Sequence, residues 1–246
     1  MAFRGICGLL SQNLREDCLV SQNSKTPIRV MRVIARMNVG GPAVQVSGLM
    51  REFDSFEFDH RLFTGFCAAD EADYLDTVAT DVKATRIEGF GRRVSVGGDI
   101  KAFISLIAAI RSFKPHVIHT HTAKAGFLGR IASILSLHPS IRVHTFHGHL
   151  LNGYFGAGKT KLVVLVEKFL ALFTDQLLAV GVKVKDDLLA EGIGNQNKFG
   201  VMPPGLQLAE VPSRSSARKE LGLNDDAKYC AFIGRITQIK RPDRFL

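Results

Sequence analysis

The sequence of 246 residues has no tryptophan, few cysteines and no long apolar run, and each shortage excludes a class of protein. The four cysteines are Cys7, Cys18, Cys67 and Cys230. They form no CxxC pair, which argues against a disulfide scaffold and favours a reduced, cytoplasmic setting. The longest apolar stretch, 162–173, is interrupted by Glu167 and Lys168 and falls short of the ~18 residues that a membrane span needs. The apolar run near the start is too short for a secretory signal peptide.

Acidic residues are also scarce, because 23 Asp and Glu stand against 32 Lys and Arg. The resulting net charge is +9 and the isoelectric point is near 9.6. Such a charge favours anionic partners, namely phosphates, nucleic acid or an acidic membrane face. An apolar content of 46% is sufficient for a globular protein with a full core.

Histidine, in contrast, is concentrated: seven of the eight histidines lie between residues 116 and 149. In this stretch, VIH after Pro115 and IRVHTF after Pro139 predict two short strands, and the amphipathic run 123–137 predicts a helix between them. A strand, a crossover helix and a second strand form a β-α-β unit with parallel strands.

Polar side chains follow the end of each of these strands. They are His119, His121 and Lys124 on the first strand and His147 and His149 on the second. In open α/β sheets the carboxyl ends of the strands border the ligand crevice. The sequence therefore predicts its polar site at this edge.

A glycine-containing loop follows the first predicted strand, RVMRVIARM, and precedes a helix predicted at 43–53. Gly40 and Gly41 would let the backbone approach a ligand closely, and the free N–H groups of a helix start favour an anion. A tight strand-to-helix turn without a ligand is the alternative, since the loop lacks the GxGxxG spacing.

The remaining pattern alternates strands and helices. Strands are predicted at 59–65, 84–87, 176–180 and 198–202, and helices at 69–80, 100–113, 159–173 and 182–191. Strict alternation predicts an α/β fold with a doubly wound parallel sheet. We expect an irregular extension at 1–27, a domain at 28–208, and from 209 to 246 a linker and the start of a second domain. That start includes a buried strand at 228–234, and the chain ends before this domain could form a core.

Two local patterns compete with a polar site at the sheet edge. Gly153 to Thr160 fits the P-loop pattern GxxxxGK[ST], but HGHLLN separates it from the preceding strand and aromatic residues fill the loop, so we interpret it as a chance match. A metal site built from the histidines would need further ligands, and no Cys, Asp or Glu joins them in sequence.

Six motifs in order resemble the family-4, retaining GT-B glycosyltransferases of bacterial cell-surface polysaccharide assembly. They are the Gly-Gly-Pro loop, HTHTAKAGFLGRIAS, HTFHGHLLNGYF, AVGVKVKDDLLAEGIG, FGVMPPGL and IGRITQIKRPDRFL. The resemblance runs from about Ile28 to Leu246. It implies two Rossmann-like domains facing each other, with the acceptor on the N-terminal domain and the nucleotide-sugar mainly on the C-terminal one.

The resemblance also implies roles for single residues. Gly40 and Gly41 would approach the donor diphosphate or the acceptor, and His147 would lie beside the transferred sugar. Arg235 and Lys240 match the basic pair that holds the diphosphate as it leaves, a role that needs no metal or other cofactor. The expected acceptor-binding residues are His121, Lys124 and His149. The alternatives are an ordinary exposed lysine for Lys124 and a buried structural histidine for His121.

Three departures from the family pattern stand out. His116 stands where members usually carry Asp, Gly181 replaces the usual Ser, and the acidic E-x7-E segment would lie beyond Leu246. We therefore expect an incomplete glycosyltransferase whose C-terminal domain is truncated.

The expected function is transfer of a sugar, with retention, from a nucleotide-diphosphate sugar to a saccharide or lipid-linked acceptor. No nucleic-acid partner is expected. The basic-apolar face Lys159–Phe173 is predicted to contact the acidic inner membrane, with packing in the core as the alternative. Two other functions remain open, a P-loop nucleotide hydrolase and a non-catalytic fragment that binds phosphate or acceptor.

Overall fold

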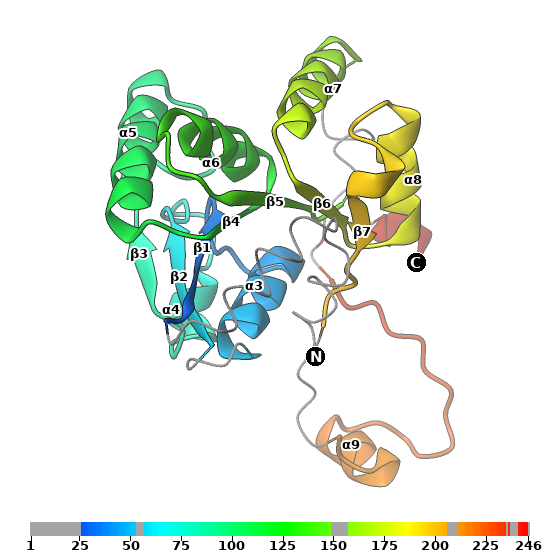
Figure 1. Ribbon diagram of the computed structural model, residues 1–246. Helices are drawn as coiled ribbons and strands as arrows, with labels where there is room; N and C mark the ends of the chain where they lie inside the picture. The colour runs from blue at the N-terminus through cyan, green and yellow to red at the C-terminus, as the bar shows by residue number, and fades with distance from the viewer. Residues whose placement is uncertain are drawn as a thin grey trace. The chain divides into compact units, whose positions relative to one another are not determined.

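The computed structural model describes residues 26–52, 57–148, 157–205, 211–234, 236 and 241–245 (Figure 1). Contacts within the chain divide it into two units, residues 1–206 and residues 207–246. The domain boundary expected at 208–209 stays a prediction.

Seven strands form one sheet in the order β3-β2-β1-β4-β5-β6-β7, and every neighbouring pair is parallel. They are β1 (Ile28–Ile34), β2 (Phe58–Thr64), β3 (Ala84–Arg86), β4 (Val117–His121), β5 (Ile141–Phe146), β6 (Gln176–Ala179) and β7 (Phe199–Val201). Parallel sheets of this kind are covered by helices on both faces.

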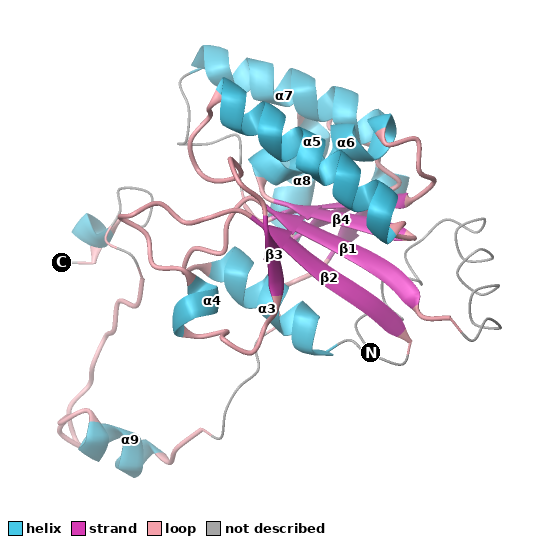
Figure 2. Cartoon of the chain, turned by 90° about the vertical axis from the view of Figure 1, so that its left-hand side faces the viewer, coloured by secondary structure: helices cyan, strands magenta, loops and turns pink. Residues whose placement is uncertain are grey.

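Six helices among the described residues of the larger unit cover the two faces. They are α3 (Gly41–Glu52), α4 (Tyr74–Thr77), α5 (Val96–Phe113), α6 (Ala123–Leu135), α7 (Ala157–Leu172) and α8 (Val182–Ala190). Figure 2 shows α3 and α4 on one face and α5, α6, α7 and α8 on the other. The predicted α/β class and doubly wound sheet are confirmed.

The helices pack through apolar stripes. On α5, Ala102, Leu106, Ile110 and Phe113 recur every three or four residues and are all buried, so one side of the helix faces the sheet. They join a core cluster with strand residues on the same face, namely Met31, Val33, Phe63 and Ile118.

Two predicted helices differ from the structure. The helix predicted at 69–80 is wrong in extent, because only α4 is helical. Asp73 has extended backbone that pairs with Asn38, and its carboxylate accepts a hydrogen bond from Leu75 N at 3.0 Å, so the helix begins after it. Conversely, α5 begins at Val96 rather than at 100, because Ser95 Oγ accepts a hydrogen bond from Gly98 N and the Asp99 carboxylate accepts one from Ser95 N.

In the smaller unit the structure describes α9 (Arg214–Glu220) and a 3₁₀ turn at Pro242–Arg244. The strand predicted at 228–234 is wrong, since these residues form no strand and are mostly exposed. A strand needs a hydrogen-bonded neighbour, and the described residues of this unit contain no second strand to provide one.

Candidate active site at the carboxyl edge of the sheet

The predicted polar site lies where four strands end together. Ile34 is in register with Thr64 on β2 and with His121 on β4, and His121 is in register with Thr145 on β5. The chain leaves this edge through the loop to Gly41 on one side and through His147 on another.

Contacts with α6 show which way the histidines face. A Cβ atom on Gly129 would lie 2.8 Å from Thr120, and one on Gly126 would lie 2.4 Å from His144. Thr120 and His144 therefore face α6. Because side chains alternate along a strand, His119 and His121 face the opposite side, which is the side of α3.

His147 is held on that same face by a hydrogen bond. His121 Nδ1 and His147 Nε2 lie 3.0 Å apart, and the ring centroids are 5.2 Å apart. Burial lowers the pKa of His147 to about 4, and burial followed by neighbouring histidines and Arg32 lowers the pKa of His121 well below its usual value. At neutral pH the pair is uncharged, so it acts through hydrogen bonds rather than as a cation.

Three buried side chains lie deeper in the sheet behind this pair. Arg32 Nη1 is 2.9 Å from His119 Nδ1, and His119 Nε2 is 2.7 Å from Thr145 Oγ1. Burial lowers the pKa of Arg32 to about 10, which leaves it charged at neutral pH. Sequence reasoning identified His119 but missed Arg32 and Thr145, although an arginine in the middle of an apolar strand is a usable signal.

The glycine loop borders open space among the described residues. A Cβ atom on Gly41 would have no atom within 4 Å, and one on Gly40 would have its nearest neighbours at 3.9 Å. Neither glycine has a positive φ. Packing and backbone conformation therefore do not require glycine at these positions, which leaves close approach of a ligand as a reason for it.

Unused hydrogen-bonding atoms collect near the same edge. His121 Nε2, Thr122 Oγ1 and Gln45 Oε1 are buried and have no hydrogen-bond partner in the part of the chain that the structure describes. Thr122 also has φ 68° and ψ 156°, a conformation that costs a non-glycine residue about 1–3 kcal/mol. Strain and unused polar atoms of this kind cluster at ligand sites.

The other predicted site residues are placed differently. Lys124 Nζ pairs with Asp99 Oδ1 at 2.5 Å and donates to the Arg93 carbonyl at 2.6 Å, so its charge is already compensated. His149, Arg235 and Lys240 lie outside the described residues and stay predictions.

The described residues lend the two competing patterns no support. Much of the P-loop match, 153–156, lies outside the described residues, and β5 ends at Phe146 rather than leading directly into it. No group of three His, Cys, Asp or Glu side chains in the described ranges is arranged to hold a metal ion.

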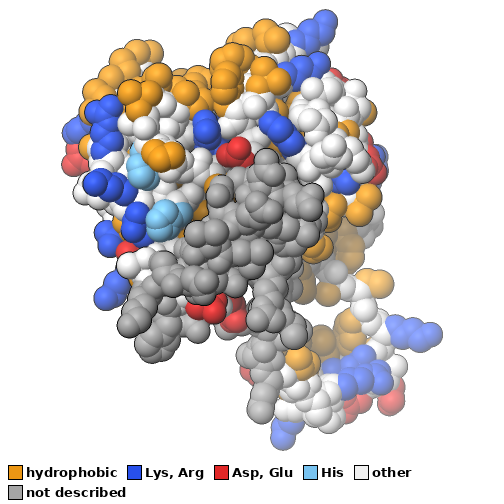
Figure 3. Space-filling model, viewed as in Figure 1, with side chains coloured by type: hydrophobic (Ala, Val, Ile, Leu, Met, Phe, Trp, Pro, Cys, Tyr) orange, Lys and Arg blue, Asp and Glu red, His pale blue; other side chains and the backbone are white. Residues whose placement is uncertain are grey.

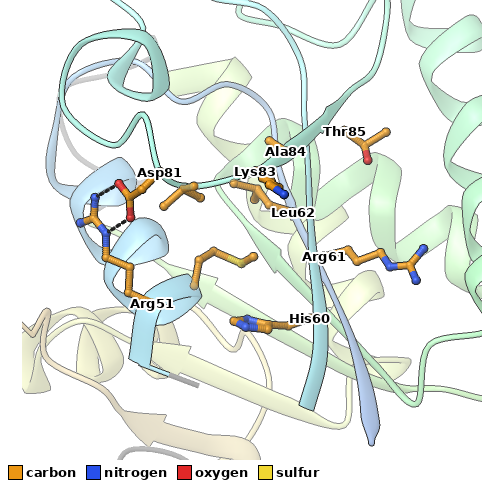
Figure 4. Close-up of a pocket in the computed structure, with 10 residues that line it drawn as sticks. Arg51, His60, Arg61, Leu62, Asp81, Lys83, Ala84 and Thr85 are labelled. Atoms are coloured by element: carbon orange, nitrogen blue, oxygen red, sulfur yellow. Dashed lines mark hydrogen bonds and ion pairs between the residues drawn. The ribbon is translucent and has the colours of Figure 1, made fainter. Parts of the chain in front are cut away.

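A cavity of about 540 Å³ lies elsewhere, between α3 and the β2–β3 edge (Figure 4). Arg51 is held there by Asp81 at 2.7 Å, and Arg61, which points away from this pair, contacts Asp59. The cavity includes none of the predicted site residues.

The face of α7 that was predicted to contact a membrane is exposed. Its apolar side chains, exposed by 43–71%, are Leu162, Leu165, Phe169, Leu172 and Phe173. Lys161 and Lys168 lie exposed beside them, and Figure 3 shows apolar side chains gathered over this helix. The other side of the same stretch, with Val164 and Ala171, packs in a core cluster, as the alternative expected. None of the described helices is both long and apolar enough to cross a membrane.

Polar side chains are also buried on the opposite face of the sheet, toward α6 and α7. Thr120 Oγ1 is 2.8 Å from His144 Nδ1, and Arg130 Nη2 donates to Glu167 Oε2 at 2.6 Å. Arg130 also donates to the Gly126 carbonyl, on the helix turn that contacts His144.

Several known proteins are similar to this chain in sequence or in fold. UDP-Gal:alpha-D-GlcNAc-diphosphoundecaprenol alpha-1,3-galactosyltransferase of Escherichia coli is 32% identical over 178 residues, 69% of this chain and 44% of that protein. The capsular polysaccharide biosynthesis glycosyltransferase CapM of Staphylococcus aureus is 24% identical over 155 residues, 61% of this chain and 40% of that protein. The chain thus spans less than half of either relative. Sucrose-phosphate synthase of Thermosynechococcus elongatus superposes with a TM-score of 0.61 at 16% identity, over 80% of this chain and 53% of that one, which shows a shared fold.

The family follows from a match that covers more than half of the chain. Residues 40–205 match the model for the glycosyl transferase 4-like domain, and this range contains the glycine loop and the His121–His147 pair. The chain belongs to the family of glycosyl transferase 4-like domains, as its motifs predicted.

Proposed function

We propose that this chain takes part in transfer of a sugar from a nucleotide-diphosphate sugar to a saccharide or lipid-linked acceptor, with retention. The observation that carries the proposal is the neutral His121–His147 pair, at the sheet edge and on the face that also carries the glycine loop. The E. coli relative, named for a UDP-sugar donor and a diphosphoundecaprenol acceptor, supports this choice of substrates.

In this proposal His147 offers a hydrogen bond to a hydroxyl of the transferred sugar, and its low pKa keeps it uncharged while it does so. Gly40 and Gly41 leave room for the donor diphosphate against the backbone. Gln45 Oε1 and His121 Nε2 supply polar atoms that hydroxyl groups would satisfy. Acceptor roles for Lys124 and His149 remain part of the proposal.

The leaving nucleoside diphosphate gains negative charge as the glycosidic bond breaks. Fixed cations near it stabilise this charge without a metal, and Arg235 and Lys240 are proposed for that role. They lie outside the described residues, so their part rests on the sequence motif.

The test is a transfer assay with radiolabelled UDP-galactose and a short-chain GlcNAc-diphospholipid. We expect labelled lipid with a version of the chain extended past Leu246 and a loss of at least about 100-fold in its variant His147→Ala, the order expected for loss of one transition-state hydrogen bond. His138→Ala is the matched control, because His138 contacts the Pro115 carbonyl before β4, away from the site. Acceptor binding without turnover for any UDP-sugar would instead support a non-catalytic acceptor-binding chain.

We also propose peripheral contact with an acidic membrane through the exposed face of α7. An apolar stripe flanked by lysines combines burial in the interface with attraction to anionic lipids. Vesicles containing anionic lipid should co-sediment with the wild-type chain at moderate salt but not with the variant Leu165→Ser/Phe169→Ser. Val94→Ser, which replaces another exposed apolar residue, should leave binding intact. Equal sedimentation of all three proteins would show that this face of α7 is not the membrane contact.

A further inference from the structure

The buried side chains behind the His121–His147 pair have no part in the transfer step described above. Arg32, His119 and Thr145 are exposed by 1%, 3% and 0%, and they come from three adjacent strands, β1, β4 and β5. Their hydrogen bonds are sufficient to fix where the protons lie.

A guanidinium group only donates hydrogen bonds. Because Arg32 Nη1 lies 2.9 Å from His119 Nδ1, that nitrogen must accept and carries no proton. The proton of His119 is therefore on Nε2, which donates to Thr145 Oγ1 at 2.7 Å. A second proton on His119 would point at Arg32, so this imidazole stays neutral.

His119 in turn supports the ring of His121. Their centroids are 4.1 Å apart with an interplanar angle of 35°, and both rings are buried. His121 then bonds to His147. A continuous line of contacts thus runs from Arg32 inside the sheet to the histidine at its edge.

We infer that Arg32 is a positioning residue, which fixes the tautomer of His119 and acts through that ring on the orientation and the neutral state of the His121–His147 pair. Its importance for catalysis rests on the proposed function of His147, whereas its effect on the histidines does not.

The charges around the pair support this inference. The titratable groups near Arg32 on this face are His60 on β2, His119 and His121 on β4, and His147 after β5, while His144 approaches from the opposite face. The buried polar residues of α3, Gln45 and Ser47, do not titrate. Among the described groups that surround the pair, Arg32 is thus the fixed charge, and a nearby cation disfavours protonation of an imidazole.

The test is nitrogen-resolved NMR of histidine side chains in the full chain, which reads tautomers and pKa values without a substrate. In the wild-type chain we expect the Nε2–H form of His119 and no titration of His147 above about pH 5. In the variant Arg32→Met, His119 should lose that preference, and the pKa values of His119 and His121 should rise because the nearby positive charge is gone. Arg32→Lys, which keeps a charged donor, should restore both.

Arg29→Met is the matched control, because Arg29 contacts His116 at the amino end of the same two strands. It should change His116 and leave His119, His121 and His147 unchanged. A folded Arg32→Met variant with wild-type histidine signals would overturn the inference.

If Arg32→Met does not fold by circular dichroism, Arg32→Lys and Thr145→Val decide. Thr145→Val removes the acceptor for His119 Nε2 and should shift the His119 and His121 signals, whereas Arg32→Lys should keep the Nε2–H form of His119. Unchanged signals in Thr145→Val, or loss of that form in Arg32→Lys, would overturn the inference. If the histidine signals change as expected but His147→Ala transfers sugar as well as the wild type does, the proposed function is refuted and the inference about Arg32 stands.

Discussion

Replacing Glu167 by Gln should lower the free energy of unfolding of the larger unit far more than a surface substitution would. The side chains of Arg130 and Glu167 are exposed by only 1% and 3%, and their atoms lie 2.6 Å apart. Burial lowers the pKa of Arg130, and Glu167 opposes that shift. Removing one member leaves a buried guanidinium without its counter-charge, which costs about 3–5 kcal/mol.

For a unit of about 200 residues this loss lowers the melting temperature by about 6–20 °C. Thermal unfolding followed by circular dichroism measures it, with chemical denaturation to give the free energy. Asp81→Asn, which breaks the exposed pair of Arg51, should hardly change either value. The double variant Arg130→Met/Glu167→Leu should recover most of the loss, since two apolar side chains of similar size leave no charge buried. A Glu167→Gln variant within about 1 kcal/mol of the wild type would refute this reasoning.

Further predictions concern two glycines and pH. Gly126→Ala should lower the free energy of unfolding by about 1–3 kcal/mol, because its methyl group would lie 2.4 Å from His144. Gly41→Ala should leave this free energy unchanged or raise it by up to about 1 kcal/mol, yet weaken nucleotide-sugar binding measured by calorimetry. The buried histidines have folded-state pKa values below the unfolded value of about 6.5, so the unfolded chain binds more protons in acid. Their contribution to stability should be complete above about pH 6.5 and fall as the pH drops toward 4. Urea unfolding in which the free energy of unfolding increases as the pH falls from 6.5 to 4 would contradict this prediction.

The sheet and most helices were predictable because their apolar periodicities are local. The β-α-β unit around His119 and His147 shows this, since proline, strand and helix follow one another within 35 residues. The helix predicted at 69–80 failed because Asp73 pairs with Asn38, a contact across the fold that no local pattern contains. The strand predicted at 228–234 failed because a strand also depends on a neighbour.

The site was predictable only in part. His121 and His147 were identified from their place after two strands, and the structure joins them by a hydrogen bond. The contribution of Arg32 was not predicted, because its contact with His119 depends on the register of β1 against β4, which sequence patterns do not give. The ion pair of Lys124 with Asp99 was missed because it joins α6 to α5, and sequence patterns do not show which residues of two helices meet.

The most direct measurement is an NMR titration of the labelled chain with UDP-galactose and a GlcNAc-diphospholipid analogue. We expect the amide signals of Gly40 and Gly41 and the ring signals of His147 to shift, because donor and acceptor would meet at the carboxyl edge of the sheet. His116 and His138, at the opposite edge, should not respond. Shifts confined to that opposite edge, with the signals of His147 and Gly41 unchanged at saturation, would contradict the proposal.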